Sequence, residues 1–500
     1  MRRESSDTVA KRAQVEDSEM RAIIEAGTRE VDWVSEEFSS IDLSDKRLNR
    51  RLIKTAQKLA KAPLSPINAA CGDWAGTQAA YRLFDNDKAS PQAILAAHTD
   101  ETVKRMAAYG GPVLVLQDTV FFSYGRHPNT QGLGPIGKSN HAHDRGLIMH
   151  NALAFTTTGV PLGILSQHTW ARKEVPEEEY QEKIERLQCT PIEEKESSKW
   201  LVGLRETGEH RVPGVQTITV ADRESDFFEF LTQAKEERAR YLIRARADRQ
   251  LVIEDSAGHA SILEAVTAAP LLGTVTVDIP GNGKRKTRTA TVEVRRAEVT
   301  IKPPQRRGQA KASGSTEPLT VNVVAATEMN PPPGIETISW VLLTNLPVKD
   351  FADATEKIAW YGIRWGIETW HKVIKSGCKV EDCLLEKAAR LQRYLTLFSI
   401  IAVRLMRVTY LARVQPEAPA TTVFSTEEIE ALQIRSDQQP TPHSAPTLRE
   451  AVRMLGRLGG HLGRKCDGEP GVTVLWRGSM SLYETVETLH AYRRSRSNST

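Results

Sequence analysis

The stretch WYGIRWGIETWHKVIK, residues 360–375, constrains the fold most, because its polar and apolar residues separate at helical spacing. At 100° per residue, a tyrosine, a glutamate and three cations fall within an arc of about 80°, and apolar residues fall on the opposite side. These polar residues are Tyr361, Arg364, Glu368, Lys372 and Lys375. A solvated charged face is the ordinary interpretation of such a helix. A single carboxylate flanked by cations also suits a site where an anionic polymer meets a bound cation.

Two aliphatic runs each lead to an aspartate. VLVLQD (113–118) predicts a buried strand with Asp118 near its end, and VQTITVAD places Asp222 just past a second strand. With Glu368 these acids form a possible ligand set for divalent cations, which prefer hard oxygen ligands. From these residues alone a structural role at the strand ends stays open, because the chain has 63 acidic residues.

The region before the first aspartate is helical in pattern. LSDKRLNRRLIKTAQKLAKAP (43–63) has a capping Asp45 and apolar residues at helical spacing. The other face of this predicted helix carries Arg47, Arg50 and Arg51. A short basic helix in a small helical domain can lie in a DNA groove, so these arginines are candidate DNA contacts. WAGTQAAYRLFDN (74–86) predicts another helix.

Beyond the second aspartate the pattern changes. YLIRARA (241–247) predicts a strand with Arg244 and Arg246 on one face. Residues 250–345 hold β-branched, alternating runs separated by turn residues, which predict antiparallel strands. Helices are expected at 388–412, 447–458 and 479–493, with a Pro/Ser/Thr-rich linker region before the last two.

Composition bounds the class of protein. Five hundred residues suggest about three domains, and a net charge of +4 does not by itself indicate a nucleic-acid binder. Five scattered cysteines favour reduced thiols in a cytoplasmic protein over a disulfide framework. The pairs Cys378/Cys383 and His141/His143 are weaker alternatives for a metal site. The N-terminus lacks the apolar core of a signal peptide, and the apolar run LTLFSIIAV is too short to span a bilayer.

The spacing Tyr-x2-Arg-x3-Glu-x6-Lys, together with LQDT and VADRESD in the expected order, resembles the signature of the insertion-sequence-four family of bacterial DDE transposases. The resemblance covers about residues 30–410 and continues more weakly through RLGGHLGRKCDGEPGVTVLWRG. Residues 1–27, the long loop at 303–318 and residues 413–446 depart from the family's pattern.

The resemblance implies an α/β fold with a ribonuclease-H-like core, a mixed β-sheet flanked by helices, and an antiparallel β insertion. Residues 1–90 would form a helical domain that binds DNA ends, with 1–27 loose. Residues 91–412 would form the catalytic domain, with the insertion at about 250–345. Residues 413–500 would form a linker and a helical dimerisation domain.

The resemblance also implies roles for individual residues. Asp118, Asp222 and Glu368 would be catalytic and would bind two Mg²⁺ per active site, with Mn²⁺ as a substitute. DNA contacts would come from Tyr361, Arg364, Trp365, His371, Lys372, Lys375, Arg244, Arg246 and Trp340. Trp340 would receive a flipped base, although a tryptophan in such a strand is more often packed in a core.

The implied activity is cut-and-paste transposition by nicking, hairpin formation and opening, and strand transfer. The implied partners are the inverted-repeat ends of the transposon, target DNA and a second copy of the chain. The protein would act in the bacterial cytoplasm, at the nucleoid when bound to DNA, without a membrane. Two alternatives stay open: a decayed transposase or repressor that only binds ends, and a stand-alone nuclease on the same core.

Overall fold

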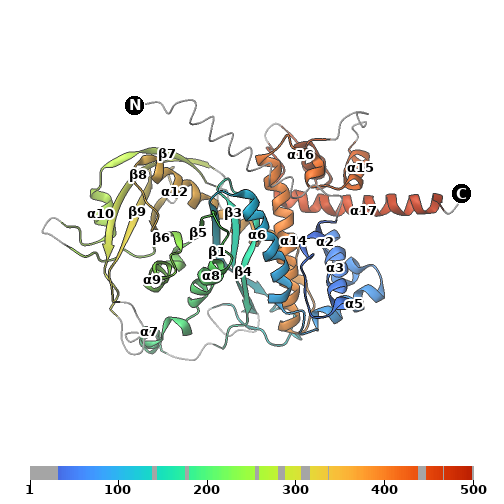
Figure 1. Ribbon diagram of the computed structural model, residues 1–500, viewed down its shortest axis with the longest axis horizontal. Coiled ribbons are helices and arrows are strands. Elements are labelled where there is room, and N and C mark those ends of the chain that lie inside the picture. The colour runs from blue at the N-terminus through green and yellow to red at the C-terminus, as the bar shows by residue number, and fades with distance from the viewer. Residues whose placement is uncertain are drawn as a thin grey trace.

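The computed structural model describes residues 32–137, 144–174, 179–253, 258–279, 288–305, 316–335, 337–436, 446–464 and 467–497. A ten-stranded mixed sheet forms its centre, with helices on both faces and a group of helices beyond one end (Figure 1). The strand order is β2-β3-β1-β5-β6-β10-β9-β8-β7, and β4 pairs with β3. This mixed α/β arrangement is consistent with a ribonuclease-H-like core. The candidate histidine pair His141/His143 lies outside the described residues.

The strands are β1 (Val113–Ser123), β2 (Gly134–Pro135), β3 (Arg145–Thr156), β4 (Pro161–Trp170), β5 (Thr217–Ala221), β6 (Arg240–Arg244), β7 (Leu271–Ile279), β8 (Arg288–Ile301), β9 (Leu319–Glu328) and β10 (Ser339–Thr344). The α-helices are α2 (Trp33–Glu37), α3 (Lys46–Lys61), α4 (Ile67–Cys71), α5 (Trp74–Phe84), α6 (Pro91–Tyr109), α7 (Tyr180–Cys189), α8 (Ser198–Glu209), α9 (Phe228–Glu236), α10 (Ile262–Ala268), α12 (Phe351–Ile363), α13 (Trp365–Lys372), α14 (Ala388–Val414), α15 (Thr426–Arg435), α16 (Leu448–Leu458) and α17 (Val472–Ser497).

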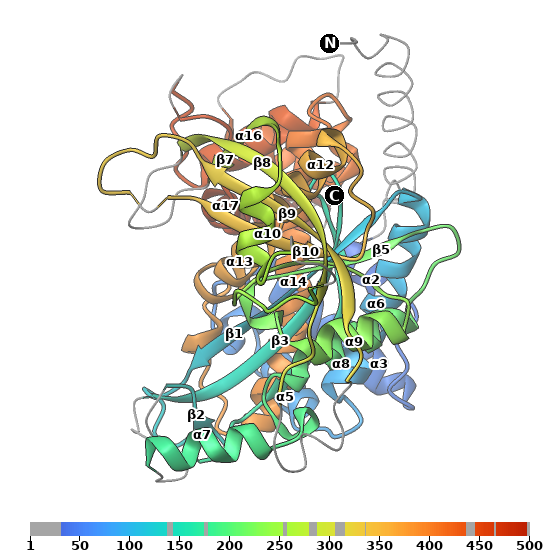
Figure 2. The same cartoon turned by 90° about the vertical axis from the view of Figure 1, so that its left-hand side faces the viewer.

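Strand β1 is longer than its aliphatic run predicts. It pairs antiparallel with β3 over its whole length, whereas its parallel pairing with β5 stops at Leu116. The expectation that Asp118 ends a strand is therefore wrong, because β3 holds β1 extended for five more residues, to Ser123. Asp118 instead lies just beyond the point where β1 loses its parallel neighbour. The two long strands β1 and β3 run out together from the body of the sheet (Figure 2).

The strands between residues 271 and 344 are antiparallel, as the alternating runs predict. Strand β10 also pairs with β6, so this region extends the central sheet. Strand β6 ends at Arg244, and the expectation of one strand through 247 is wrong at its end. The buried Asp226 carboxylate accepts from the Arg246 backbone N–H at 2.7 Å and pairs with Arg249, which turns the chain out of the strand.

Helix α14 is the long core helix that the sequence predicts at 388–412. By length and composition it is the one helix among the described residues that could cross a membrane, but most of its apolar window is buried inside the protein. It lies against β4 and α6, with Ser399 completely buried. Burial inside the fold explains its apolar composition without a membrane.

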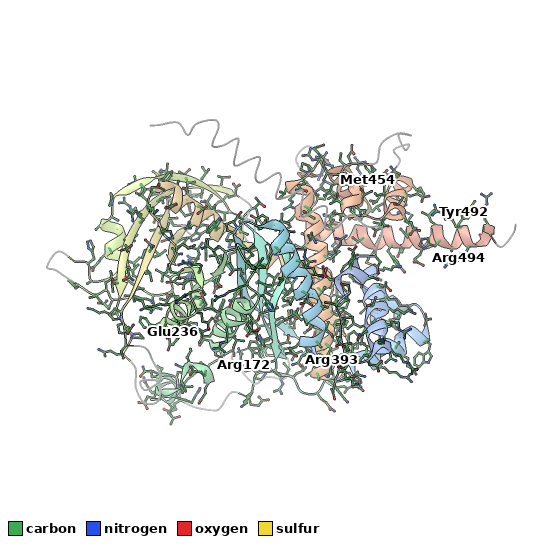
Figure 3. The ribbon with its side chains drawn as sticks, viewed as in Figure 1. Arg172, Glu236, Arg393, Met454, Tyr492 and Arg494 are labelled. Carbon is green, nitrogen blue, oxygen red and sulfur yellow. The ribbon has the colours of Figure 1, made fainter. Side chains whose placement is uncertain are left out.

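The predicted basic helix is present as α3. The Asp45 carboxylate accepts from the backbone N–H groups of Arg47 and Leu48, and the predicted apolar face is buried. The helices before residue 90 are anchored to the core through α14. Arg393, at the contact between α14 and these helices (Figure 3), pairs with Asp87 at 2.7 Å.

Helices α16 and α17 pack with their backbones almost in contact. A Cβ on Gly459 would lie 1.8 Å from the Val474 carbonyl oxygen, and a Cβ on Gly478 would lie 1.9 Å from the Leu455 carbonyl oxygen. The predicted second helix, 479–493, starts earlier than expected, at Val472. This close packing lets the segment before 479 continue the helix instead of forming a loop. The far end of α17 extends away from the rest of the chain (Figure 1).

We expect Gly478→Val to force α16 and α17 apart, because its side chain would overlap the Leu455 carbonyl group. Overpacking of this kind costs about 1–3 kcal/mol, so the melting temperature should fall. Gly208→Val in α8 is the matched control, since a Cβ there meets no atom closer than 3.8 Å. Equal melting temperatures for the two variants would contradict the close packing.

Candidate active site

The two aspartates lie just past the paired segments of the neighbouring parallel strands β1 and β5. Val113 pairs with Thr217, an offset of 104 residues, and the same 104 residues separate Asp118 from Asp222. Asp222 follows the last residue of β5 and caps a short 3-10 turn by accepting from the Glu224 backbone N–H at 2.8 Å. The strand register thus brings both carboxylates to one place in the sheet.

The predicted signature helix is present in two parts that meet at Arg364. Helix α12 ends at Ile363, α13 begins at Trp365, and a π-helical turn covers Val373–Gly377. Arg364 itself keeps right-handed helical backbone angles. Its guanidinium donates to Glu368 Oε1 at 2.5 Å and lies 3.8 Å from Asp118 Oδ2. Glu368 is 53% exposed, whereas Arg364 is buried. The guanidinium therefore joins the helical acid to the first strand acid.

The Asp118 carboxyl group occupies an unfavourable position for a negative charge. Its pKa is raised to about 7, chiefly by burial and to a smaller extent by the nearby carboxylates of Asp222 and Glu368, against the opposing effects of the Thr119 backbone N–H and Arg364. The three predicted acids therefore interact electrostatically across β1, the end of β5 and α13. No three His, Cys, Asp or Glu side chains among the described residues are yet close enough together to hold a metal ion.

The donor set nevertheless fits a hard divalent cation. Three carboxylates supply the oxygen ligands that Mg²⁺ and Mn²⁺ prefer. A mostly buried carboxyl whose pKa is raised by burial, and to a smaller extent by its acidic neighbours, is a position where an added positive charge would be stabilised. In the structure Arg364 supplies the positive charge between Asp118 and Glu368.

His371 is not a free cation on the helix surface. Its side chain is mostly buried, with Nδ1 4.0 Å from Asp118 Oδ2, and burial lowers its pKa to about 3. Its imidazole is therefore neutral at physiological pH. The helical wheel places it only next to the cations, whereas in the structure its ring faces the Asp118 carboxylate.

Tyr361 is buried, whereas the helical wheel presents it together with the cations. Burial raises the pKa of its hydroxyl, against the opposing effect of the Arg364 and Arg244 charges, and the Arg364 guanidinium lies 5.8 Å from the centre of its ring. Trp340, on β10, is 6% exposed and packs edge-on against the Tyr361 ring, with centroids 5.2 Å apart. Arg244, Tyr361 and Trp340 thus form one layer beside the acids.

The remaining predicted contacts are spread more widely. Lys372 is exposed and Trp365 is half-buried. Lys375 donates to the Phe121 carbonyl oxygen at 2.9 Å and lies 3.3 Å from Glu381. Arg246 lies past the end of β6 on the surface, so it does not share a strand face with Arg244. Arg47 and Arg50 are exposed and Arg51 half-buried on α3, in the helices before residue 90.

The two cysteines that might suggest a metal site, Cys378 and Cys383, are both buried. Cys378 and Cys383 are free thiols, and burial raises the pKa of both, that of Cys383 to about 12. Protonated thiols of this kind are poor metal ligands.

The motifs that point to the three acids do not include two buried amides near Asp118. Asn151 and Gln167 are polar residues inside the strands β3 and β4, and the strand register puts them in a row with Asp118. Within β3, HN (150–151) interrupts an otherwise apolar run, and this interruption is the signal that could have found Asn151; Gln167 lies in the polar end of β4 and has no such signal.

Three family models match the chain: Transposase DNA-binding over residues 30–89, Transposase DDE domain over 184–404, and Transposase Tn5 dimerisation domain over 400–500. The DDE match includes Asp222 and Glu368. The chain is a DDE-type DNA transposase, with a domain for binding DNA, a domain for cleaving it and a domain for dimerisation. The last of the three matches is to the dimerisation domain of Tn5 transposase, and the three matches together support a transposase of this type.

Proposed function

We propose that the protein is a cut-and-paste transposase of the insertion-sequence-four family that excises its element through hairpin ends and joins it to target DNA. The observation that carries the proposal is the convergence of Asp118, Asp222 and Glu368 from β1, the end of β5 and α13. The family matches support a DNA-cleaving enzyme with paired subunits.

In this proposal Asp118, Asp222 and Glu368 hold two Mg²⁺, with Mn²⁺ as a substitute. Divalent cations in such a site activate a water or a 3′-hydroxyl and stabilise the leaving oxygen. Glu368 Oε1 now accepts from the Arg364 guanidinium, and we propose that metal binding exchanges this contact for a metal–carboxylate bond. The same exchange frees Arg364 to bind a DNA phosphate.

The residues around the acids are placed to hold DNA. Arg364 and the exposed Lys372 extend from the acids along α13. Lys375 lies beside β1, and Arg244 beside Tyr361. We propose that these groups bind phosphates on either side of the scissile bond. Neutral His371 would help to fix the Asp118 carboxylate rather than bind a phosphate.

The end-binding function is assigned to about residues 30–90. Exposed cations on α3, including Arg47 and Arg50, would contact phosphates, together with Arg51. Helix α5 carries two exposed aromatic residues, Trp74 (76%) and Tyr81 (40%), which lie on the same face of the helix about two turns apart. Aromatic side chains next to cations suit contact with bases, so we propose that α5 reads the end sequence.

The partners proposed for the rest of the chain follow the same logic. A second copy would pair through α15, α16 and the projecting α17, so that two ends are held together. Target DNA would enter after excision. The proposed location is the bacterial cytoplasm, at the nucleoid when DNA is bound.

The full-length protein should excise a fragment flanked by the element's own terminal repeats in Mg²⁺, leaving flush ends that pass through hairpins. Denaturing gels of end-labelled DNA would resolve the nick, the hairpin and the opened end. Binding without cleavage would favour an end-binding repressor. Nicks independent of the terminal repeats would favour a stand-alone nuclease.

We expect Arg364→Ala to weaken assembly on terminal DNA and to flatten its salt dependence. Each phosphate contact adds about 0.9 to the slope of log K against log salt on duplex DNA. Arg205→Ala, a 60% exposed arginine on α8, is the matched control and should leave the slope unchanged. An equal slope for both variants, with normal cleavage, would mean that Arg364 contacts no DNA phosphate and serves only to hold Glu368.

A further inference from the structure

A row of buried polar side chains leads away from Asp118 into the core. In the antiparallel register, Asp118 pairs with Asn151 on β3, and Asn151 pairs with Gln167 on β4. Directly paired residues point to the same face of a sheet, with Cβ atoms about 4.5–5.5 Å apart. The three side chains therefore stand side by side on the face that α13 and α14 cover.

The row is anchored at its far end. The Gln167 amide donates to Asn151 Oδ1 at 2.9 Å and to Ser399 Oγ on α14 at 2.8 Å. Ser399 in turn donates to the Leu395 carbonyl oxygen at 2.7 Å. Asn151 and Ser399 are 0% exposed. Gln167 thus links Asn151 to α14, and this link sets the orientation of the Asn151 amide.

The near end of the row is incomplete. Asn151 Nδ2 has no hydrogen-bond partner among the described residues, and neither has Nε2 of His371, whose other ring nitrogen faces Asp118. Leaving a buried donor without an acceptor is costly, so an unpaired Nδ2 needs an explanation. Since Gln167 occupies the Oδ1 side of the Asn151 amide, the acceptor next to Nδ2 in the register is the Asp118 carboxylate.

We propose that Asn151 is a positioning residue for Asp118. Held by Gln167 and Ser399, its NH₂ group donates to the Asp118 carboxylate when that carboxylate turns to bind a cation, and so fixes the orientation of the ligand. The proposal rests on the proposed metal-binding function of Asp118. It adds a residue that the resemblance does not assign, and it explains why polar residues occupy the interior of β3 and β4.

The same strand offers a matched control. Gln117 precedes Asp118 and is also a completely buried amide whose Nε2 lacks a partner among the described residues. It lies on the other face of the sheet, where its Oε1 is 3.2 Å from His150 Nε2 and where Gly203 of α8 approaches it. Loss of the Gln117 amide therefore removes a buried polar group but leaves the contacts among Asn151, Gln167 and Ser399 intact.

The test compares Asn151→Leu with Gln117→Met in the full-length protein, using Mn²⁺ alone as the probe. Free Mn²⁺ is measured by electron paramagnetic resonance, and thermal stability is measured on the same samples. Partners that orient metal ligands typically change affinity 10- to 100-fold. We expect Asn151→Leu to weaken Mn²⁺ binding about tenfold or more while the melting temperature stays the same or rises, and we expect Gln117→Met to keep wild-type affinity.

A second variant covers the case in which Asn151→Leu does not fold. Gln167→Met keeps the volume of the side chain and removes the group that holds Asn151, so it should weaken Mn²⁺ binding by a smaller factor. Wild-type affinity in both row variants would overturn the proposal, as would an equal loss in Gln117→Met. Asp118→Asn distinguishes failure of the Asn151 proposal from failure of the proposed metal site. If this variant does not reduce Mn²⁺ binding either, the metal-binding function of Asp118 is itself wrong.

Discussion

Asp118→Ala, Asp222→Ala and Glu368→Ala proteins should bind terminal DNA and fail to cleave it. Each variant removes an oxygen ligand from the proposed cation site. Charge stabilisation by bound metal supplies several kcal/mol to the transition state, and each 1.36 kcal/mol is a factor of ten. We therefore expect single-turnover cleavage rates to fall by about a thousandfold or more. End binding, measured by gel shift, should stay within a few-fold of wild type.

The stability of these variants distinguishes lost chemistry from lost structure. Ionised Asp118 is disfavoured by burial, so its removal should leave the melting temperature unchanged or higher. Glu224→Ala is the control, because this exposed carboxylate lies two residues past Asp222 and faces Lys199 of α8 at 3.6 Å. Wild-type cleavage by Glu368→Ala in Mg²⁺ would refute the assignment.

Trp340→Ala should destabilise the protein, because the indole is 6% exposed and packs against Tyr361. Loss of a core tryptophan costs about 3–5 kcal/mol. A role in receiving a flipped base adds a second effect, since stacking of a base on an aromatic ring contributes about 1–3 kcal/mol. The predicted result is a lowered melting temperature, together with a rate of hairpin formation that falls more than the rate of nicking.

Two further variants separate packing from stacking at Trp340. Trp340→Phe keeps an aromatic ring in the core and should recover most of the stability. Trp200→Ala, a fully buried tryptophan on the α8 side of the sheet, should depress nicking and hairpin formation together. If Trp340→Ala also slows every step equally, the residue is only a core residue, and the base-flipping role is excluded.

The elements that were predicted well are those that a local pattern determines. The spacing of apolar residues in α3 and the capping Asp45 give that helix its position and its exposed face. The alternating runs give the antiparallel strands β7–β10. The acids were found through the motif on α13, since two aspartates after aliphatic runs are too common to identify a site alone.

The elements that were predicted poorly depend on tertiary contacts. β1 extends past Asp118 because it stays paired with β3. β6 stops at Arg244 because the Asp226 carboxylate accepts a hydrogen bond from the backbone N–H of Arg246. The helical wheel places Tyr361 with the exposed cations, but packing against Trp340 buries it. These tertiary contacts are not visible in the periodicity of the segments themselves.

The position of Mn²⁺ in crystals of the full-length protein with terminal DNA tests whether the three acids are metal ligands. We predict anomalous density ligated by Asp118, Asp222 and Glu368, with the Arg364 guanidinium moved from Glu368 to a DNA phosphate. Glu368 still paired with Arg364, with no Mn²⁺ density at the two aspartates, would contradict it.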